Sequence, residues 1–218
     1  IDNYADHVNS MEYDASINMS LARFLMVPYA ADDAFLLKAI KNLNPYKLDF
    51  DPNYYIYGGG LIYPSALALK IAEKVGYVKL TPDIAFYLAN PDMSGRLYKV
   101  LRLLILIFSV IGLGIVYLYA VKNHGQWPAI VTLSLMLINP ETIASSHALE
   151  PHMYVLAFFS LSLYFAYRYH KSDALTNDYL PAAIFAGLSI GTQASSIYIV
   201  TPIIITAFLS FYKKSRSY

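Results

Sequence analysis

The chain has 218 residues, of which 57% are hydrophobic, 15% aromatic and only 14% charged, whereas a soluble domain typically carries about 25% charged residues. The lack of cysteine excludes disulfides and thiolate metal sites. The formal net charge of +1 gives no electrostatic basis for binding nucleic acid, so we expect no nucleic-acid partner.

The charged residues are unevenly distributed. Residues 1–98 hold eleven Asp or Glu against eight Lys or Arg, and residues 99–218 hold four against eight. We expect an extracytoplasmic region at 1–98 and a membrane bundle of about five hydrophobic helices at 99–218. The predicted fold class is all-α, a multi-pass transmembrane helix bundle with short interfacial helices in a long first outer loop.

The polar region is expected to contain short helices joined by loops. Apolar residues recur at helical spacing in 16–27 and 33–43, and the second of these helices should end at Asn44-Pro45. Residues 58–60 are three glycines, which is turn composition. Residues 65–75 are amphipathic and predict a helix lying along the membrane interface.

The second half contains the apolar runs. Residues 99–121 are long enough for one membrane span, which needs about 20 apolar residues. Residues 128–139 are shorter, and 151–167 form an aromatic-rich helix. Residues 179–212 are too long for one span, so we expect a break at Gly191-Thr192-Gln193, whose polar side chains would satisfy the interrupted backbone.

Basic residues predict the orientation. Lys122, Arg168, Lys171 and the basic tail after residue 212 alternate along the chain with short loops at 140–149 and about 191–196 that lack Lys and Arg. The positive-inside rule places the basic loops in the cytoplasm. The polar region and Glu150 would then face the opposite, outer side.

An acidic pair, Asp32-Asp33, lies at the start of the predicted helix 33–43. Asp is a good helix N-cap, so a structural role is one interpretation. The alternative is that one carboxylate faces a substrate and acts in catalysis while the other holds structure.

A segment dense in Tyr, Gly and Pro occupies residues 49–64. Tyrosine rings suit a membrane interface and stack on sugars, and glycine allows close backbone approach to a ligand. The segment is either an interfacial anchor or a substrate-binding loop. The candidate substrate-binding residues are Tyr55, Tyr57, Gly58, Gly59 and Tyr63.

The outer loop around residues 139–152 carries His147, Glu150 and His152 at the mouth of a predicted span. Ionisable groups at membrane depth are costly and suggest function. These three residues are candidates to bind a divalent ion or a phosphate, although their spacing matches no established metal motif. Solvation of an ordinary loop is the alternative.

These motifs occur in a known order. The stretch ADDAFLLKAIKNLNPYKLDFDPNYYIYGGGLIYP, the loop NP…SSHALEP and the segment AGLSIGTQASSIYIVTPIII together resemble the multi-pass C-type glycosyltransferases that use polyprenyl-phosphate-linked sugars. Within that superfamily the chain is similar to the prokaryotic branch related to protein O-mannosyltransferases and aminoarabinose transferases. The resemblance covers about residues 28–212, and it implies that further spans precede and follow this chain.

The resemblance implies roles for particular residues. Asp32 matches the acidic residue that acts as catalytic base, Asp33 matches the Glu that follows it, and Glu150 matches an Asp at the start of a later span. Two positions depart from the family pattern. Gln193 stands where the family has Lys, and the Gly58–Pro64 element lacks a basic residue that some relatives carry. The ligand of the donor phosphate therefore stays open.

The reaction implied is inverting transfer of a sugar from a polyprenyl phosphate to an acceptor hydroxyl of a protein, lipid or glycan, at the outer face of a prokaryotic plasma membrane. The leaving phosphate needs positive charge. A divalent cation, Mg²⁺ or Mn²⁺, near Glu150 and His147 could supply it. The alternative is a basic side chain at the outer end of the first span; the candidates are Arg96, Lys99 and Arg102.

Two other classes of protein fit the composition. A transporter or flippase would need polar residues inside its spans and usually a repeated half, and neither is visible. A non-catalytic membrane scaffold that binds a partner through its outer region is the second. Uptake of substrate without sugar transfer would indicate the first, and tolerance of every acidic substitution in the outer region would indicate the second.

Overall fold

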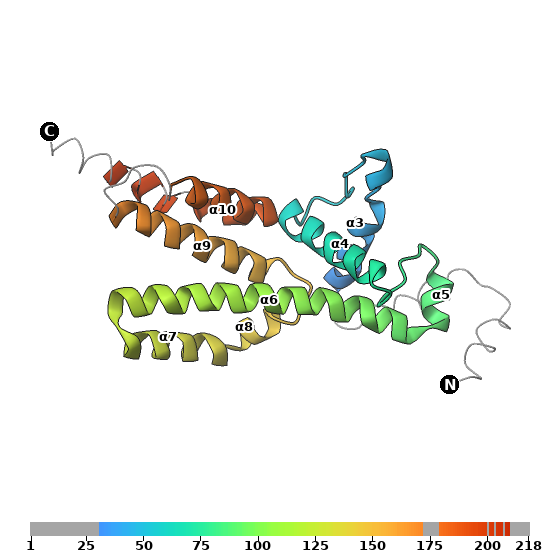
Figure 1. The fold of residues 1–218 in the computed structure, drawn as a ribbon, viewed down its shortest axis with the longest axis horizontal. Helices are drawn as coiled ribbons and strands as arrows, with labels where there is room; N and C mark the ends of the chain where they lie inside the picture. Colours follow the sequence, from blue (N-terminus) through green and yellow to red (C-terminus); the bar gives the residue numbers. More distant parts are fainter. Residues whose placement is uncertain (1–30, 172–178, 200, 203, 207, 210–218) are drawn as a thin grey trace. The chain divides into compact units, whose positions relative to one another are not determined.

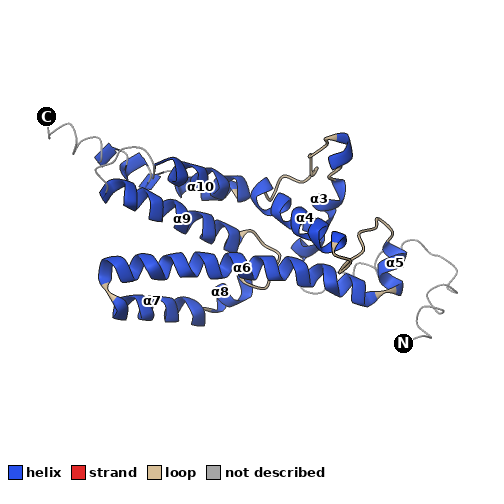
Figure 2. Cartoon of the chain, viewed as in Figure 1, coloured by secondary structure: helices blue, strands red, loops and turns tan. Residues whose placement is uncertain are grey.

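The computed structural model describes residues 31–171, 179–199, 201–202, 204–206 and 208–209, and this part of the chain is helical without a β-strand (Figure 2). One isolated antiparallel bridge joins Asn44 to Asp49. The helices in chain order are α3 (Ala31–Asn42), η1 (Pro45–Lys47), α4 (Gly59–Lys74), α5 (Ile84–Ala89), α6 (Pro91–His124), α7 (Gln126–Ile138), α8 (Pro140–Ser145), α9 (His152–Lys171), α10 (Tyr179–Thr192) and η2 (Ala194–Ile199) (Figure 1). The all-α prediction is confirmed for the described residues.

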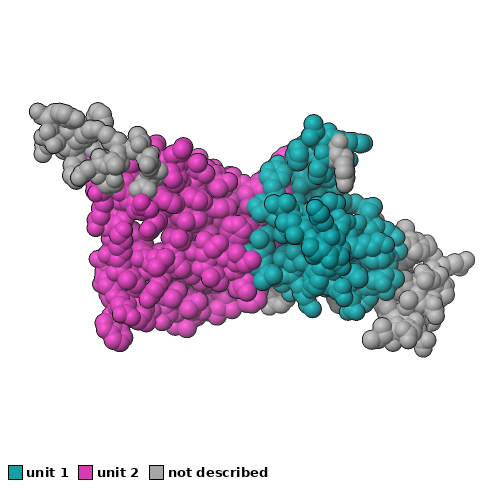
Figure 3. All heavy atoms as spheres, viewed as in Figure 1, with its two compact units in different colours: residues 1–54, 63–104 teal, residues 55–62, 105–218 magenta. Residues whose placement is uncertain are grey.

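The chain packs as two compact units (Figure 3). Unit 1 comprises residues 1–54 and 63–104, and unit 2 comprises residues 55–62 and 105–218. Each unit is described by itself. The predicted division at residue 98 concerns placement in a membrane, which packing does not test, so it stays a prediction.

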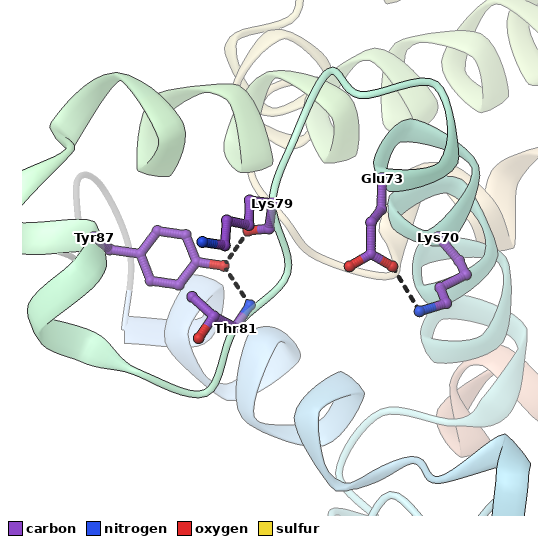
Figure 4. Close-up of polar contacts among 5 residues, drawn as sticks. All are labelled: Lys70, Glu73, Lys79, Thr81 and Tyr87. Atoms are coloured by element: carbon purple, nitrogen blue, oxygen red, sulfur yellow. Dashed lines mark hydrogen bonds and ion pairs between the residues drawn. The ribbon is translucent and has the colours of Figure 1, made fainter.

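Unit 1 contains a helix that the sequence did not suggest. Helix α5 begins after Asp83, whose side chain accepts a hydrogen bond from the backbone N–H of Ala85 at 2.9 Å and so caps the helix. The hydroxyl of Tyr87 donates to the carbonyl of Lys79 at 2.7 Å and accepts from the N–H of Thr81 at 3.2 Å (Figure 4). These bonds fold the 79–83 loop back onto α5.

Helix α4 begins earlier than predicted. The three glycines were expected to form a turn, with a helix from residue 65, but α4 starts at Gly59 and contains Pro64. The carbonyl of Gly58 accepts hydrogen bonds from the N–H groups of Leu61 and Ile62, at 3.1 and 3.3 Å. At the other end of α4, Lys70 and Glu73 form an exposed ion pair of 2.6 Å (Figure 4).

The predicted first span lies inside α6. This helix has 34 residues and is longer than expected because Pro91 and Asp92 favour a helix start. Among the described residues α6 is the one helix long and apolar enough to cross a membrane by length and composition. Only 22% of its apolar window is buried, whereas the core helix of a soluble protein would be mostly buried. Its surface therefore suits lipid better than a protein core.

Helices α6 and α9 run parallel within unit 2. The ring of Phe108 stacks on that of Tyr154, with centroids 4.1 Å apart, and further along both helices Tyr119 meets Tyr167 edge-on at 5.1 Å. Between these contacts the backbones approach closely at Gly112, where a Cβ atom would lie 3.0 Å from the Leu156 side chain and 3.1 Å from the backbone of Ala157. The C-terminal ends of α6 and α9 therefore lie at the same end of the helix pair.

Helices α7 and α8, which come between α6 and α9 in the sequence, carry the chain back from the end of α6 to the start of α9. Gly125, with φ of 89°, joins α6 to α7 in a single residue, a conformation that favours glycine. The outer loop predicted at 140–149 is partly helical, because Asn139 caps α8 by accepting the N–H of Glu141 at 2.9 Å. Asn139-Pro140 therefore breaks the returning segment into two short helices.

Helix α10 packs antiparallel to α9 (Figure 1). The hydroxyl of Ser162 donates to the carbonyl of Ala182 at 2.8 Å, and Phe165 stacks on Phe185 with centroids 5.8 Å apart. The predicted break is confirmed, since α10 ends at Thr192 and η2 follows. The prediction of a helix at 33–43 is also confirmed by α3, and that at 16–27 lies outside the described residues.

The contact at Gly112 generates a prediction. Gly112→Leu should lower the thermal unfolding midpoint of the detergent-solubilised protein, because overpacking a tight contact typically costs about 1–3 kcal/mol. Gly114→Leu is the matched control, since nothing lies within 4 Å of a Cβ at that position. Equal midpoints for the two variants would show that α6 and α9 do not approach at Gly112.

Candidate functional site

The acidic pair lies at the described start of α3. Asp32 and Asp33 are in the first turn of Ala31–Asn42, and their side chains are outside the described part of the structure. A carboxylate in the first turn of a helix is favoured by the helix dipole. A structural role and a role as base therefore both stay open for this pair, which belongs to unit 1.

The first half of the tyrosine-rich segment is fastened to α3 and α4 within unit 1. The ring of Tyr54 stacks on Phe35 of α3, with centroids 5.5 Å apart and an interplanar angle of 9°. The side-chain amide of Asn42 donates to the carbonyl of Pro52 at 2.7 Å. Tyr63, a predicted substrate-binding residue, donates its hydroxyl to the carbonyl of Phe50 at 3.1 Å. Residues 50–54 are therefore fixed by contacts with α3 and α4.

The second half of the segment docks on the end of α10 within unit 2. The N–H of Gly58 donates to the carbonyl of Thr192 at 2.9 Å. A Cβ atom on Gly58 would lie 2.0 Å from the carbonyl oxygen of Gly191, and one on Gly60 would lie 2.0 Å from the Thr192 hydroxyl oxygen. We call this contact the Gly58–Thr192 junction. The glycines were expected to let the backbone approach a ligand closely. At Gly58 and Gly60 the backbone instead approaches α10 closely.

The Gly58–Thr192 junction brings two sequence motifs together. Its hydrogen bond joins the peptide unit between Tyr57 and Gly58 to the peptide unit between Thr192 and Gln193, so Tyr57 and Gln193 are neighbours across it. Tyr57 is half-buried, whereas Tyr55 is 77% exposed. The sequence offered one signal for this contact, which is that both segments contain small residues.

Buried hydroxyl groups stabilise the break after α10. Thr192 is fully buried and donates to the carbonyl of Leu188 at 2.7 Å. Ser196 donates to the carbonyl of Gln193 at 2.7 Å, and the hydroxyl of Ser189 donates to that of Ser196 at 3.4 Å. The interpretation of the polar residues here as groups that satisfy a helix break is therefore confirmed for Thr192 and Ser196, and for the Gln193 side chain it stays a prediction.

Glu150 and His152 form a pair in the turn that leads into α9. The Oε2 atom of Glu150 lies 3.3 Å from Nε2 of His152, and the two side chains are 25% and 47% exposed. Glu150 is held between Leu149 and Pro151, which are both fully buried. The turn thus presents a carboxylate and an imidazole at the N-terminus of a helix, where negative charge is favoured.

His147 is placed differently from this pair. Its Nδ1 atom lies 2.8 Å from the carbonyl of Ile143 and 3.0 Å from the hydroxyl of Ser146. Among the residues that the structure describes, no group of three Asp, Glu or His side chains is close enough to hold a metal ion. Since the side chains of Asp32 and Asp33 are outside that set, a metal site stays a prediction.

Three candidate cations follow one another along the first part of α6. The guanidinium of Arg96 lies over the Tyr77 ring, 5.5 Å from its centroid, and donates to the Tyr77 carbonyl at 3.3 Å. Lys99 is exposed and Arg102 is half-buried. Arg96 is thus engaged in fixing the loop after α4, and Lys99 is the more accessible charge.

The Gly58–Thr192 junction can be tested by Gly58→Ala. A Cβ atom there would overlap the Gly191 carbonyl, so the loop must leave α10, and amide hydrogen exchange over residues 55–62 should rise by at least about tenfold. Gly187→Ala, on α10 where nothing lies within 4 Å of a Cβ, is the control and should exchange like the unmodified protein. Unchanged exchange in Gly58→Ala would mean that the junction does not form.

Comparison with known proteins identifies a family. The model of the dolichyl-phosphate-mannose-protein mannosyltransferase family matches residues 92–217, more than half of the chain. No curated protein and no solved structure matches it. The matched range includes Arg96, Arg102, the 147–152 turn and Gln193, and it does not include Asp32 or residues 55–63. The chain belongs to the dolichyl-phosphate-mannose-protein mannosyltransferase family, and is thus a membrane glycosyltransferase of the mannosyltransferase type.

Proposed function

We propose that this protein transfers a sugar from a polyprenyl-phosphate donor to an acceptor hydroxyl at the outer surface of a plasma membrane. The observation that carries the proposal is the family match over residues 92–217. The exposed apolar surface of α6 supports it, because a donor with a polyprenyl tail stays in the bilayer and its enzyme must meet it there.

The chemistry requires one base. The acceptor oxygen attacks the anomeric carbon, the bond from that carbon to the phosphate oxygen breaks, and the configuration inverts. The acceptor proton passes to a carboxylate, for which Asp32 is the candidate, and the polyprenyl phosphate leaves with the bonding electron pair. General base catalysis of this kind typically contributes about 10²–10⁴-fold to the rate.

The leaving phosphate requires a positive partner. Glu150 and His152, 3.3 Å apart, offer the oxygen and nitrogen donors that Mn²⁺ accepts, and a bound divalent cation would stabilise negative charge on the phosphate. Lys99 and Arg102 are the alternative. Tyr57 and Gln193, joined across the Gly58–Thr192 junction, would contribute neutral contacts to the sugar or the phosphate.

A multi-pass arrangement is proposed for unit 2. Helix α9 has 20 residues, about 30 Å at 1.5 Å per residue, which matches the hydrocarbon thickness of about 30 Å. Helices α7 and α8 together cover a similar length. The parallel course of α6 and α9 puts Lys122 at the same end as Lys171 and puts Glu150 at the other, which agrees with basic residues facing the cytoplasm.

Asp32→Asn separates the two interpretations of the acidic pair. Asn caps a helix as well as Asp does, but it cannot accept the proton, so release of polyprenyl phosphate from polyprenyl-phosphate mannose in membranes should fall by about 10²–10⁴-fold. Asp83→Asn is the matched control, since Asp83 caps α5 and Asn should preserve that cap and the activity. Full activity of Asp32→Asn would exclude Asp32 as the base.

The orientation can be measured with single cysteines, because the chain has none of its own. A membrane-impermeant maleimide should label Tyr55→Cys and His147→Cys from outside intact cells, and Lys122→Cys and Lys171→Cys only after the membrane is opened. All four side chains are exposed. Labelling of positions 55 and 147 from opposite sides would rule out a shared outer site.

A further inference from the structure

A cavity of about 370 Å³ lies within unit 2, and none of the candidate site residues lines it. It is formed by α6, α9 and the described residues near the end of the chain, Thr206 and Leu209. This volume is within the range of about 300–1,000 Å³ typical of pockets for small molecules. Its walls are mainly apolar and include Ile115, Val116 and Leu163.

The polarity of the cavity changes along the helix axes. Since α6 and α9 are parallel, residue number increases in the same direction on both walls. Ile115 comes first on α6, and on α9 Ser160, whose hydroxyl donates to the carbonyl of Leu156 at 2.7 Å, is followed by Leu163. Tyr119 and Tyr167 come next, and His170 lies nearest the helix ends. The cavity is thus apolar at one end and polar at the other, like an amphiphilic molecule.

Positive charge surrounds the polar end. The ammonium of Lys171 lies over the Tyr167 ring, 4.8 Å from its centroid, and the Tyr167 hydroxyl donates to the side-chain carbonyl of Asn123. Lys122, beside Asn123, is exposed. Arg168 is not counted with these lysines, because its guanidinium lies over the ring of Phe165, which packs against α10. His170 thus lines the cavity, Lys171 contacts its lining residue Tyr167, and Lys122 lies in the last turn of α6.

Two structural explanations account for part of this arrangement. Basic residues in the last turn of a helix offset its dipole, and tyrosines favour a membrane interface. Neither explains an apolar hollow of this size between two helices, whose walls lack partner atoms on one side and so make fewer dispersion contacts. An occupant with an apolar chain would restore those contacts.

We propose that the cavity binds one anionic phospholipid, with an acyl chain between α6 and α9 and its phosphate at Lys122, His170 and Lys171. A polyprenyl phosphate shares this chemistry, but the donor proposed above would place its phosphate near Glu150. Glu150 and His170 are separated by nearly the whole of α9, about 27 Å at 1.5 Å per residue. The phospholipid site therefore stands whether or not the proposed transferase activity does.

The test uses the purified full chain in a neutral detergent with equal amounts of phosphatidylglycerol and phosphatidylcholine, and native mass spectrometry counts the lipids retained. We expect one phosphatidylglycerol, preferred over phosphatidylcholine by about tenfold or more. The double variant Lys122→Gln/Lys171→Gln should lose that preference. Lys74→Gln, an exposed lysine at the end of α4, is the control and should keep it.

A second variant tests the apolar end. Ala166 is buried and lines the cavity, so Ala166→Leu should fill part of it and abolish retention of either lipid, with no loss of helical circular dichroism. Equal retention of the two lipids by the unmodified chain would overturn the proposal. So would an unchanged preference in the double variant, whose two positions are exposed and should not affect folding, or displacement of phosphatidylglycerol by polyprenyl phosphate at equal concentration.

Discussion

The close packing of α6 on α9 at Gly112 is the constraint on which the arrangement of unit 2 depends. The aromatic contacts on either side of it show that the two helices are parallel, so residues 125–151, which connect them in the sequence, must bring the chain back to the end where α9 starts. That return places the Glu150 turn at one end of the helix pair and the basic residues at the other. A bulkier residue at position 112 would separate the helices, and the aromatic contacts on either side of it would be lost with them.

The Gly58–Thr192 junction couples residues more than 130 positions apart in the chain. Its glycines are needed because the backbone of α10 occupies the space that side chains would take. Protein interiors are packed densely enough that such a contact cannot absorb a methyl group without movement. The junction gives the exposed Tyr55 and the half-buried Tyr57 a fixed base, which a binding loop requires if its geometry is to be reproducible.

The apolar runs were sufficient to predict α6, α7 and α9, and the polar residues at 191–193 predicted the end of α10, because both signals are local. Helix α4 was predicted to start too late, since three glycines are usually a turn and the contact that Gly58 makes is with a distant segment. Helix α5 was missed because it depends on the Asp83 cap and on Tyr87. For the candidate site, sequence proximity predicted that Glu150 and His152 would lie together, but no local pattern could predict that Tyr57 would neighbour Gln193.

The length of α6 has a consequence for how the protein responds to its surroundings. Its apolar stretch, residues 99–121, measures about 35 Å, against a hydrocarbon layer of about 30 Å. Hydrophobic mismatch is accommodated mainly by tilting, and a continuous helix tilts as a rigid rod. In the membrane placement proposed above, the depth of Lys99 and Arg102 would therefore vary with lipid composition, so that bilayer thickness becomes one of the variables that set the electrostatics around these two residues.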